Sequence, residues 1–178
     1  MGLPRSVDGG LVRLRLLTLR DAAVVQRLAG DAAVSAMTAT IPHPYPPGAA
    51  RAWIATHPRV RARGDFVYGI VREGGALVGT LGVRIAPNPH GNIGYWIGRP
   101  YWGNGYATAA ARAGIACLFT HTGLGWLMAA HLADNHRSAS VLAKCGMHEV
   151  ARQAVEHRGR PASLVLRRID RADWERSR

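Results

Sequence analysis

The turn Trp102–Thr108 holds the residues whose types and spacing are best suited to chemistry. It reads Trp-Gly-Asn-Gly-Tyr-Ala-Thr and stands between a segment with strand character and one with helical character. The first amides of a helix lack an intrahelical acceptor and carry a partial positive charge. The glycines at 103 and 105 would let this backbone wrap around an anion, and Ala107 leaves the helix start uncrowded. The turn therefore predicts a binding site for a phosphate or pyrophosphate group.

Two common nucleotide-binding patterns do not fit this turn. A Rossmann dinucleotide site needs Gly-x-Gly-x-x-Gly and an acid about twenty residues later. Here Thr108 stands at the third glycine position, and no acid lies between Ala107 and Ala133. A Walker A loop needs Gly-Lys-Ser/Thr, which is also missing from the turn. NAD and ATP are therefore disfavoured as the phosphate-bearing ligand.

The elements that must position this turn can be outlined from the spacing of apolar residues. Alternating or short continuous apolar runs predict strands at 11–17, 66–72, 77–85, 92–98, 126–133, 148–157 and 163–169. Helical spacing and capping residues predict helices at about 21–29, 49–57, 107–118 and 135–145. Pro58 is expected to end or kink the second helix, and turns are expected at 87–91 and 158–161. Hairpins mixed with strand–helix–strand connections predict an α/β fold with one mixed sheet and helices on its faces.

The size and composition of the chain favour one soluble domain. The 178 residues suit a single domain, and a hydrophobic content of 48% supplies a core. We expect residues 1–10 to form a flexible tail and residues 11–174 the domain. No apolar run approaches the roughly 20 residues that a membrane span needs, and the N-terminus lacks the apolar segment of a secretory signal. These features predict a cytoplasmic protein with no membrane partner.

The cysteines, histidines and charges narrow the chemistry further. Cys117 and Cys145 form no CxxC pair, and the histidines show no metal-ligand spacing, so no metal site is predicted. The net charge of +12 is a feature of nucleic-acid-binding proteins. However, the basic residues are scattered and no basic stripe alternates with aromatic residues, so no specific nucleic-acid partner is predicted. An arginine-biased composition and a field that attracts an anionic cofactor remain as the two explanations.

Three landmarks of this chain resemble the GNAT superfamily of N-acetyltransferases, and more narrowly its RimJ/RimL-like branch, which acetylates ribosomal-protein N-termini. The landmarks are Ile93-Gly94-Tyr95-Trp96-Ile97, Tyr101–Thr108, and Asp134-Asn135-x-x-Ser138 leading to Lys144-Cys145-Gly146-Met147. The resemblance runs from about Leu11 to Trp174. Trp102 replaces the first residue of the superfamily cradle Gln/Arg-x-x-Gly-x-Gly/Ala, whereas Gly105 and Ala107 hold the other two positions.

The resemblance implies a fold and a cofactor. The fold would have a mostly antiparallel sheet of about seven strands, splayed between strands 92–98 and 126–133, with about four helices. The cofactor would be acetyl-CoA, with CoA as product, and its pantetheine arm would lie in the splayed gap. The implied cofactor-binding residues are Trp96, Ile97, Trp102, Gly103, Asn104, Gly105, Tyr106, Ala107, Thr108, Asn135, Ser138 and Lys144.

The resemblance also implies catalytic and acceptor-side residues. The Ser138 hydroxyl would donate to the leaving sulfur, Glu156 would act as base, and Tyr95 is the third catalytic candidate. The acceptor-side candidates are His43, Tyr45, Asn92 and His131. Plainer alternatives remain open: Asn135 and Ser138 as helix caps only, Glu156 as a surface residue, and His131 as a hydrogen-bonded core histidine. Family members often carry acids where this chain has Asn92 and Ala109, and many carry a tyrosine where it has Leu142.

The predicted function is direct acetyl transfer from acetyl-CoA to a primary amine. A protein N-terminus, a polyamine, an aminoglycoside and an amino acid all remain open as acceptors. The missing acids motivate one alternative, a catalytically impaired acyl-CoA-binding regulatory module. The charge motivates another, a nucleic-acid-binding protein. Dimers are common in the resembled branch, but the sequence leaves open whether this chain forms a homodimer.

Overall fold

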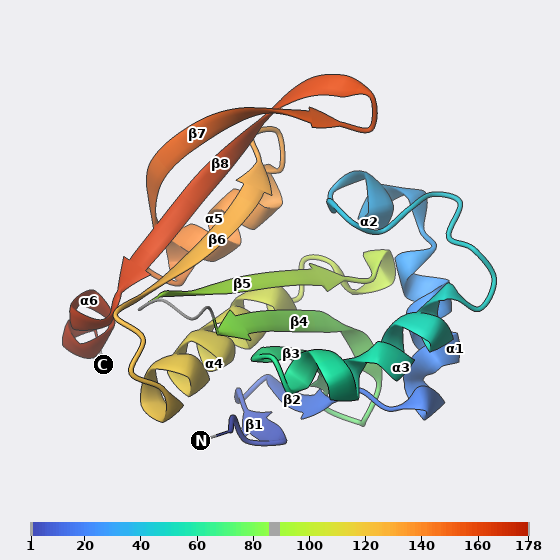
Figure 1. Cartoon of the computed structure of the whole chain (residues 1–178), viewed down its shortest axis with the longest axis horizontal. Helices are drawn as coiled ribbons and strands as arrows, with labels where there is room; N and C mark the ends of the chain where they lie inside the picture. Colours follow the sequence, from blue (N-terminus) through green and yellow to red (C-terminus); the bar gives the residue numbers. More distant parts are fainter. Residues whose placement is uncertain (1, 86–89, 178) are drawn as a thin grey trace.

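A computed structural model of the chain describes residues 2–85 and 90–177. These residues form one sheet of eight strands in the order β1-β2-β3-β4-β5-β6-β8-β7 (Figure 1). The strands are β1 (Ser6–Asp8), β2 (Val12–Leu16), β3 (Asp65–Arg72), β4 (Leu77–Ile85), β5 (His90–Ile97), β6 (Trp126–Leu132), β7 (His148–His157) and β8 (Arg160–Asp170). All neighbouring strands are antiparallel except β5 and β6, which are parallel. The predicted mixed α/β fold is confirmed, whereas most of the turn expected at 87–91 lies outside the described residues.

Residues 1–10, which the sequence predicts to be a flexible tail, contain the strand β1, which the sequence does not predict. Ser6–Asp8 pairs with β2 in the antiparallel direction, and the Ser6 hydroxyl donates to the Leu14 carbonyl at 3.0 Å. Leu3 is buried in the core. A strand of three residues is too short to show an alternating pattern, so only its pairing with β2 reveals it. The sequence-based count of seven strands is one too low for this reason.

Helices cover both faces of the sheet. The described residues contain α1 (Ala22–Ala29), α2 (Ala32–Ala36), α3 (Ala49–Arg61), α4 (Tyr106–His121), α5 (His136–Lys144) and α6 (Arg171–Arg176), with 3-10 turns at Leu19–Asp21 and Arg99–Tyr101. The four predicted helices correspond to α1, α3, α4 and α5. The two others have fewer than two turns, which is too short for a helical period to be recognised. Pro58 lies inside α3, which continues to Arg61.

Each face of the sheet has its own hydrophobic cluster. α4 contacts β1 to β5 from one side, whereas α1 packs on β4 and α3 on β3. Side chains along a strand alternate between faces, and this alternation separates two neighbours in β5. Tyr95 packs with the cluster under α4, and Trp96 packs with the cluster under α1 and α3. Adjacent residues of one strand therefore serve opposite faces of the molecule.

The sheet divides between β5 and β6. These strands pair only where His90–Asn92 meets Trp126–Met128. Beyond that point β5 stays paired with β4 as far as Ile97, and β6 stays paired with β8 as far as Leu132. In Figure 1, β6 runs away from β5 and carries β8 and β7 with it. The splay predicted between these strands is confirmed, and it leaves two facing strand edges without a strand partner.

Within the described part of the chain, no helix has both the length and the apolarity required to span a membrane. The described His, Cys, Asp and Glu side chains form no group of three or more that could hold a metal ion. Cys117 and Cys145 are both free thiols and both buried.

Candidate active site

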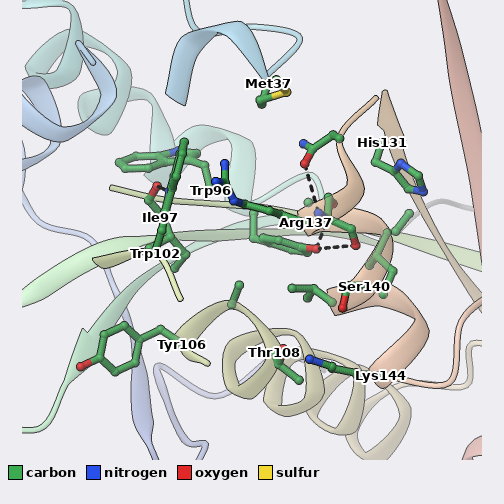
Figure 2. Close-up of a pocket in the computed structure, with 18 of the residues that line it drawn as sticks. Met37, Trp96, Ile97, Trp102, Tyr106, Thr108, His131, Arg137, Ser140 and Lys144 are labelled. Carbon is green, nitrogen blue, oxygen red and sulfur yellow. Dashed lines mark hydrogen bonds between the residues drawn. The ribbon is translucent and has the colours of Figure 1, made fainter. Parts of the chain in front are cut away.

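A cavity of about 540 Å³ opens where β5 and β6 diverge (Figure 2). Met37, at the end of α2, lies on one side of it, and Tyr106, Thr108 and Lys144 lie on the opposite side. The cavity brings together most of the residues predicted to bind cofactor or to act in catalysis. Those that line it are Tyr95, Trp96, Ile97, Trp102, Gly103, Asn104, Gly105, Tyr106, Ala107, Thr108, Asn135, Ser138 and Lys144, together with the predicted acceptor-side residue His131.

The glycine turn at the start of α4 has the geometry of an anion cradle. Gly103 and Gly105 have φ values of 82° and 78°, a conformation that glycine adopts without steric cost. Gly105 caps the helix, and the Ala109 amide is the first to donate within it, to the Gly105 carbonyl. The preceding amides of the first turn lack an acceptor inside the helix, and that turn carries no acidic residue. The cradle therefore fits a phosphate group.

Side-chain contacts fix the cradle to β5. The Trp102 indole N–H donates to the Ile97 carbonyl at 2.7 Å. The Asn104 amide donates back to the carbonyls of Tyr101 and Trp102, so Asn104 stabilises the turn itself. The Arg137 guanidinium lies 4.6 Å from the centroid of the Trp102 ring, a distance at which a cation is attracted to an aromatic face. Trp102 thus holds the turn against the end of β5, and its ring attracts the Arg137 guanidinium beside the cavity.

Two hydroxyl groups meet in the cavity. Tyr95 Oη and Ser138 Oγ are 3.0 Å apart. The Ser138 amide donates to Asn135 Oδ1 at 3.1 Å, so Asn135 caps α5. Burial raises the pKa of Tyr95 to about 12, although the hydrogen bond to Ser138 acts in the opposite direction. The phenol is therefore protonated at neutral pH, and the pair can donate a hydrogen bond to a group in the cavity.

His131 reaches the cavity wall with both ring nitrogens engaged. Nδ1 is 2.8 Å from the Leu132 carbonyl, which can only accept, so this nitrogen carries the proton. Arg167 Nε donates to Nε2 at 3.2 Å. The side chain is buried, with only 6% of its surface exposed. This arrangement favours a hydrogen-bonded core histidine over a general base.

Four predicted residues do not line the cavity. Glu156 is exposed near the tip of the β7–β8 hairpin, opposite Pro161. Asn92 is exposed in the last pair that joins β5 to β6. Tyr45 packs on the cluster under α1 and α3, and His43 is exposed in the same loop. Glu156 is the next-to-last residue of β7, so it lies in the last pairs before the hairpin turn, and that part of the hairpin does not border the cavity.

Other lining residues were not anticipated from the sequence. Val34, Met37 and Thr38 come from the region of α2, and Arg137 and Ser140 come from α5. α2 is too short to show a helical period, so its residues could not be anticipated. Arg137, however, stands next to Ser138 in the first turn of α5, and this position could have indicated that it lies at the cavity. Arg137 and Lys144 supply formal charges, and the described lining contains no aspartate or glutamate.

A family model described as an acetyltransferase (GNAT) domain matches residues 12–148 of this chain. The chain belongs to the GNAT acetyltransferase family. This membership confirms the predicted enzyme class, an acyltransferase. It also agrees with the sheet divided between β5 and β6 and with the cradle at the start of α4.

Solved structures share the fold of this GNAT chain over nearly its whole length. The GNAT-family acetyltransferase from Bacillus anthracis aligns with a TM-score of 0.83 at 18% identity, covering 94% of this chain and 99% of the other. Mycobacterium smegmatis RimJ, solved in complex with CoA-disulfide, gives 0.84 at 24% identity, covering 96% and 90%. The ribosomal-protein-S5-alanine acetyltransferase from Vibrio fischeri gives 0.81 at 20% identity, covering 95% and 98%.

Proposed function

We propose that this GNAT protein transfers an acetyl group from acetyl-CoA to the α-amine at a protein or peptide N-terminus. One observation carries the proposal: a single cavity joins the glycine cradle of α4 to the hydroxyl pair of Tyr95 and Ser138. A phosphate group and a reacting carbonyl can therefore occupy the same cavity at the same time.

The cradle end of the cavity suits the cofactor. The amides of Tyr106, Ala107 and Thr108 would hold the pyrophosphate, and the cations Arg137 and Lys144 lie beside it. The facing edges of β5 and β6 offer backbone groups to the amides of an extended pantetheine arm. When bound, acetyl-CoA supplies the thioester as acetyl donor. The CoA-disulfide in the RimJ structure supports this choice of cofactor.

The chemistry needs little acid–base assistance from the protein. The amine nitrogen bonds to the acetyl carbon, the carbon–sulfur bond breaks, the nitrogen loses a proton and the sulfur gains one. The Ser138 hydroxyl, paired with Tyr95, donates a hydrogen bond to the departing sulfur. A free α-amine has a pKa of about 8, so water can take its proton. This route agrees with a described lining that contains no carboxylate.

The same lining favours an acceptor without a second positive charge. Polyamines and aminoglycosides carry further ammonium groups, and burying such a group without a partner is unfavourable. The charged side chains of the described lining are cations, which would repel those groups. A small uncharged N-terminal residue such as alanine or serine avoids this repulsion. The Vibrio fischeri neighbour is named for an alanine of ribosomal protein S5, and this name supports small N-terminal residues as the class of acceptor.

Calorimetric titration with acetyl-CoA, followed by assays of CoA release, tests the proposal. We expect micromolar affinity, about −8 kcal/mol, with no binding of NADH or ATP. CoA release is then expected with short peptides that begin with alanine or serine, and much less with spermidine or kanamycin. Binding without turnover of any amine would favour the regulatory module. A folded protein that does not bind acetyl-CoA would refute the enzyme proposal.

A further inference from the structure

The tip of the β7–β8 hairpin is hydrogen-bonded to the region of α2. Arg158 Nη2 donates to the Ser35 carbonyl at 2.7 Å, to Ser35 Oγ at 2.7 Å and to the Ile41 carbonyl at 2.6 Å. The His157 ring donates from Nε2 to the Ala36 carbonyl at 2.9 Å. Figure 1 shows the hairpin tip bending over toward α2. Segments far apart in the sequence are thus joined across the top of the molecule.

The point of attachment belongs to a wall of the cavity. Val34, Met37 and Thr38 line the cavity, and Ser35 lies among them with no exposed surface. The Ser35 hydroxyl also donates to the Ile41 carbonyl at 2.8 Å, so the helix and the following loop share one bonded centre. In Figure 2 this wall, marked by Met37, lies across the cavity from Tyr106 and Lys144 of the cradle end.

The backbone at Arg158 supports a role for its side chain. Arg158 has a φ of 56°, and among the described residues it is the one position other than glycine with positive φ. Gly159 has a φ of 73°, and His157 pairs with Arg160, so the two residues form a two-residue hairpin turn. Asparagine or glycine is strongly preferred at the first position of such a turn. Arginine at a strained position points to a task for the guanidinium.

We propose that Arg158 is a positioning residue that clasps segment 32–41 and so fixes the cavity wall facing the acceptor amine. Three oxygens converge on one nitrogen, so the loss of that nitrogen frees both the end of α2 and the loop at Ile41. The cradle lies on the other side of the cavity, and cofactor affinity is expected to be independent of the clasp. The nature of the acceptor rests on the proposed function, whereas the clasp itself does not.

Substitution of Arg158 by asparagine separates the clasp from the turn. Asparagine tolerates positive φ, so Arg158→Asn is expected to keep the hairpin folded while removing the three bonds. Arg158→Lys places an ammonium with three N–H bonds near the same oxygens and is expected to restore part of the effect. Arg160→Asn is the matched control, because it makes the same change of charge at an exposed position of the same hairpin.

Three measurements on the full chain test the clasp: KM for a short peptide that begins with alanine, Kd for acetyl-CoA, and amide hydrogen exchange of residues 32–41. For Arg158→Asn we expect a rise of about tenfold in KM, the size expected when one well-placed charged hydrogen-bonding group is lost. We also expect faster exchange in 32–41 and an unchanged Kd. The lysine variant should fall between wild type and Arg158→Asn, and Arg160→Asn should match wild type.

Some contrary outcomes would overturn the clasp, and others would overturn the proposed function. Wild-type exchange in 32–41 and a wild-type KM in a folded Arg158→Asn variant would overturn the clasp. A peptide KM that rises equally in Arg160→Asn would also overturn it, because the effect would then be one of charge. If the wild-type protein acetylates no amine, the proposed function fails. The exchange of 32–41, measured with acetyl-CoA binding intact, still decides the clasp.

Discussion

At the scale of single residues, the anion cradle depends on backbone conformation more than on side-chain chemistry. Gly105 combines positive φ with the N-cap position of α4, so its amide and those after it can face a ligand. A Cβ at this position would lie 3.4 Å from Leu11 Cδ2, an ordinary van der Waals contact. The glycine is therefore required for its positive φ and not for space.

Gly105→Glu is expected to abolish acetyl-CoA binding. The substitution places a negative charge where the pyrophosphate belongs and forces an L-residue into positive φ. Gly75→Glu is the matched control, because Gly75 has a φ of 84° in the β3–β4 turn and nothing within 4 Å of its Cβ position. Calorimetric titration of both variants checks the expectation. Equal loss of affinity in the two would show strain alone, and retained affinity in Gly105→Glu would refute the cradle.

Ser138→Ala is expected to lower kcat by about 100- to 1000-fold, the range for loss of one hydrogen-bond donor that acts in the transition state. Tyr95→Phe should lower it by a similar factor, because the two hydroxyls are bonded to each other at 3.0 Å. For the same reason the double variant should be less impaired than the product of the single effects predicts. Acetyl-CoA affinity should stay near wild type in all three variants. Unchanged turnover in Ser138→Ala would leave this residue a structural part of α5.

His57 gives the fold a specific sensitivity to acid. Its side chain is buried against Trp53, and neither ring nitrogen has a hydrogen-bond partner among the described residues. Burial, followed by the charge of Arg61, lowers its pKa from 6.5 to about 4. The unfolded chain therefore binds a proton below pH 6.5 that the folded chain excludes. Above pH 6.5 this difference in proton binding at His57 does not affect the stability of the fold. As the pH falls from 6.5 toward 4, it destabilises the fold increasingly.

His57→Phe should remove this part of the pH dependence. The difference in unfolding free energy between variant and wild type should shift in favour of the variant by up to about 3 kcal/mol between pH 7 and pH 4, at about 1.4 kcal/mol per pKa unit. Phenylalanine keeps an aromatic edge against Trp53. Urea unfolding at a series of pH values measures the difference. Parallel stability curves for the two proteins would show that His57 has the same pKa in the folded and the unfolded chain, against the lowered pKa.

At the scale of elements, the positions of α4 and α6 are linked by one side chain. Arg171 donates to the carbonyls of Phe119, Thr122 and Leu124 at 2.8, 2.7 and 2.9 Å. These carbonyls lie at and just beyond the C-terminal end of α4, where helix carbonyls lack intrahelical donors. Arg171 therefore closes the end of the helix whose other end forms the cradle.

Arg171→Met is expected to destabilise the fold by about 2–4 kcal/mol, because it leaves several partly buried carbonyls unpaired while retaining an apolar stem. Arg176→Met is the control, since Arg176 is exposed and pairs with Asp173. Urea midpoints of the two variants give the comparison. If both midpoints match that of wild type, the three bonds contribute nothing to stability.

At the scale of the whole molecule, the net charge of +12 acts as a diffuse field. Several of the basic side chains of the described residues have partners within the fold. Arg15 pairs with Asp21, Arg171 binds carbonyls, and Arg158 binds the α2 segment. A net positive charge is expected to attract anions in general, and the scattered basic residues of the sequence predict no surface that reads a nucleic acid.

Random-sequence duplex DNA should therefore bind weakly, with a Kd of about 10⁻⁴–10⁻⁶ M at physiological salt and a steep loss of affinity as salt rises. Acetyl-CoA should lose much less affinity over the same salt range, because a built cradle holds it. Fluorescence anisotropy and calorimetry across a salt series compare the two ligands. Nanomolar DNA binding at physiological salt would revive the nucleic-acid-binding alternative.

The features that the sequence determined are those set by neighbouring residues. The glycines at 103 and 105 specify a turn whose φ values only glycine adopts freely, and the apolar periods on either side specify a strand and a helix. The same local rules place Asn135 as the cap of α5 and Gly146, with a φ of 79°, just after its end. Together with the strand pattern, they were enough to predict the mixed sheet, whereas the divergence of β5 from β6 was implied by the resemblance to the GNAT superfamily.

Tertiary structure alone decided which residues share the cavity, because that depends on contacts between distant segments. It pairs Tyr95 with Ser138, engages both nitrogens of His131, and carries Glu156 to an exposed hairpin tip. The short elements β1 and α2 were also not predicted, since three or five residues carry no detectable period. The bonds from Arg158 to segment 32–41 depend on the same long-range packing, so local sequence rules could not reveal the wall that they support.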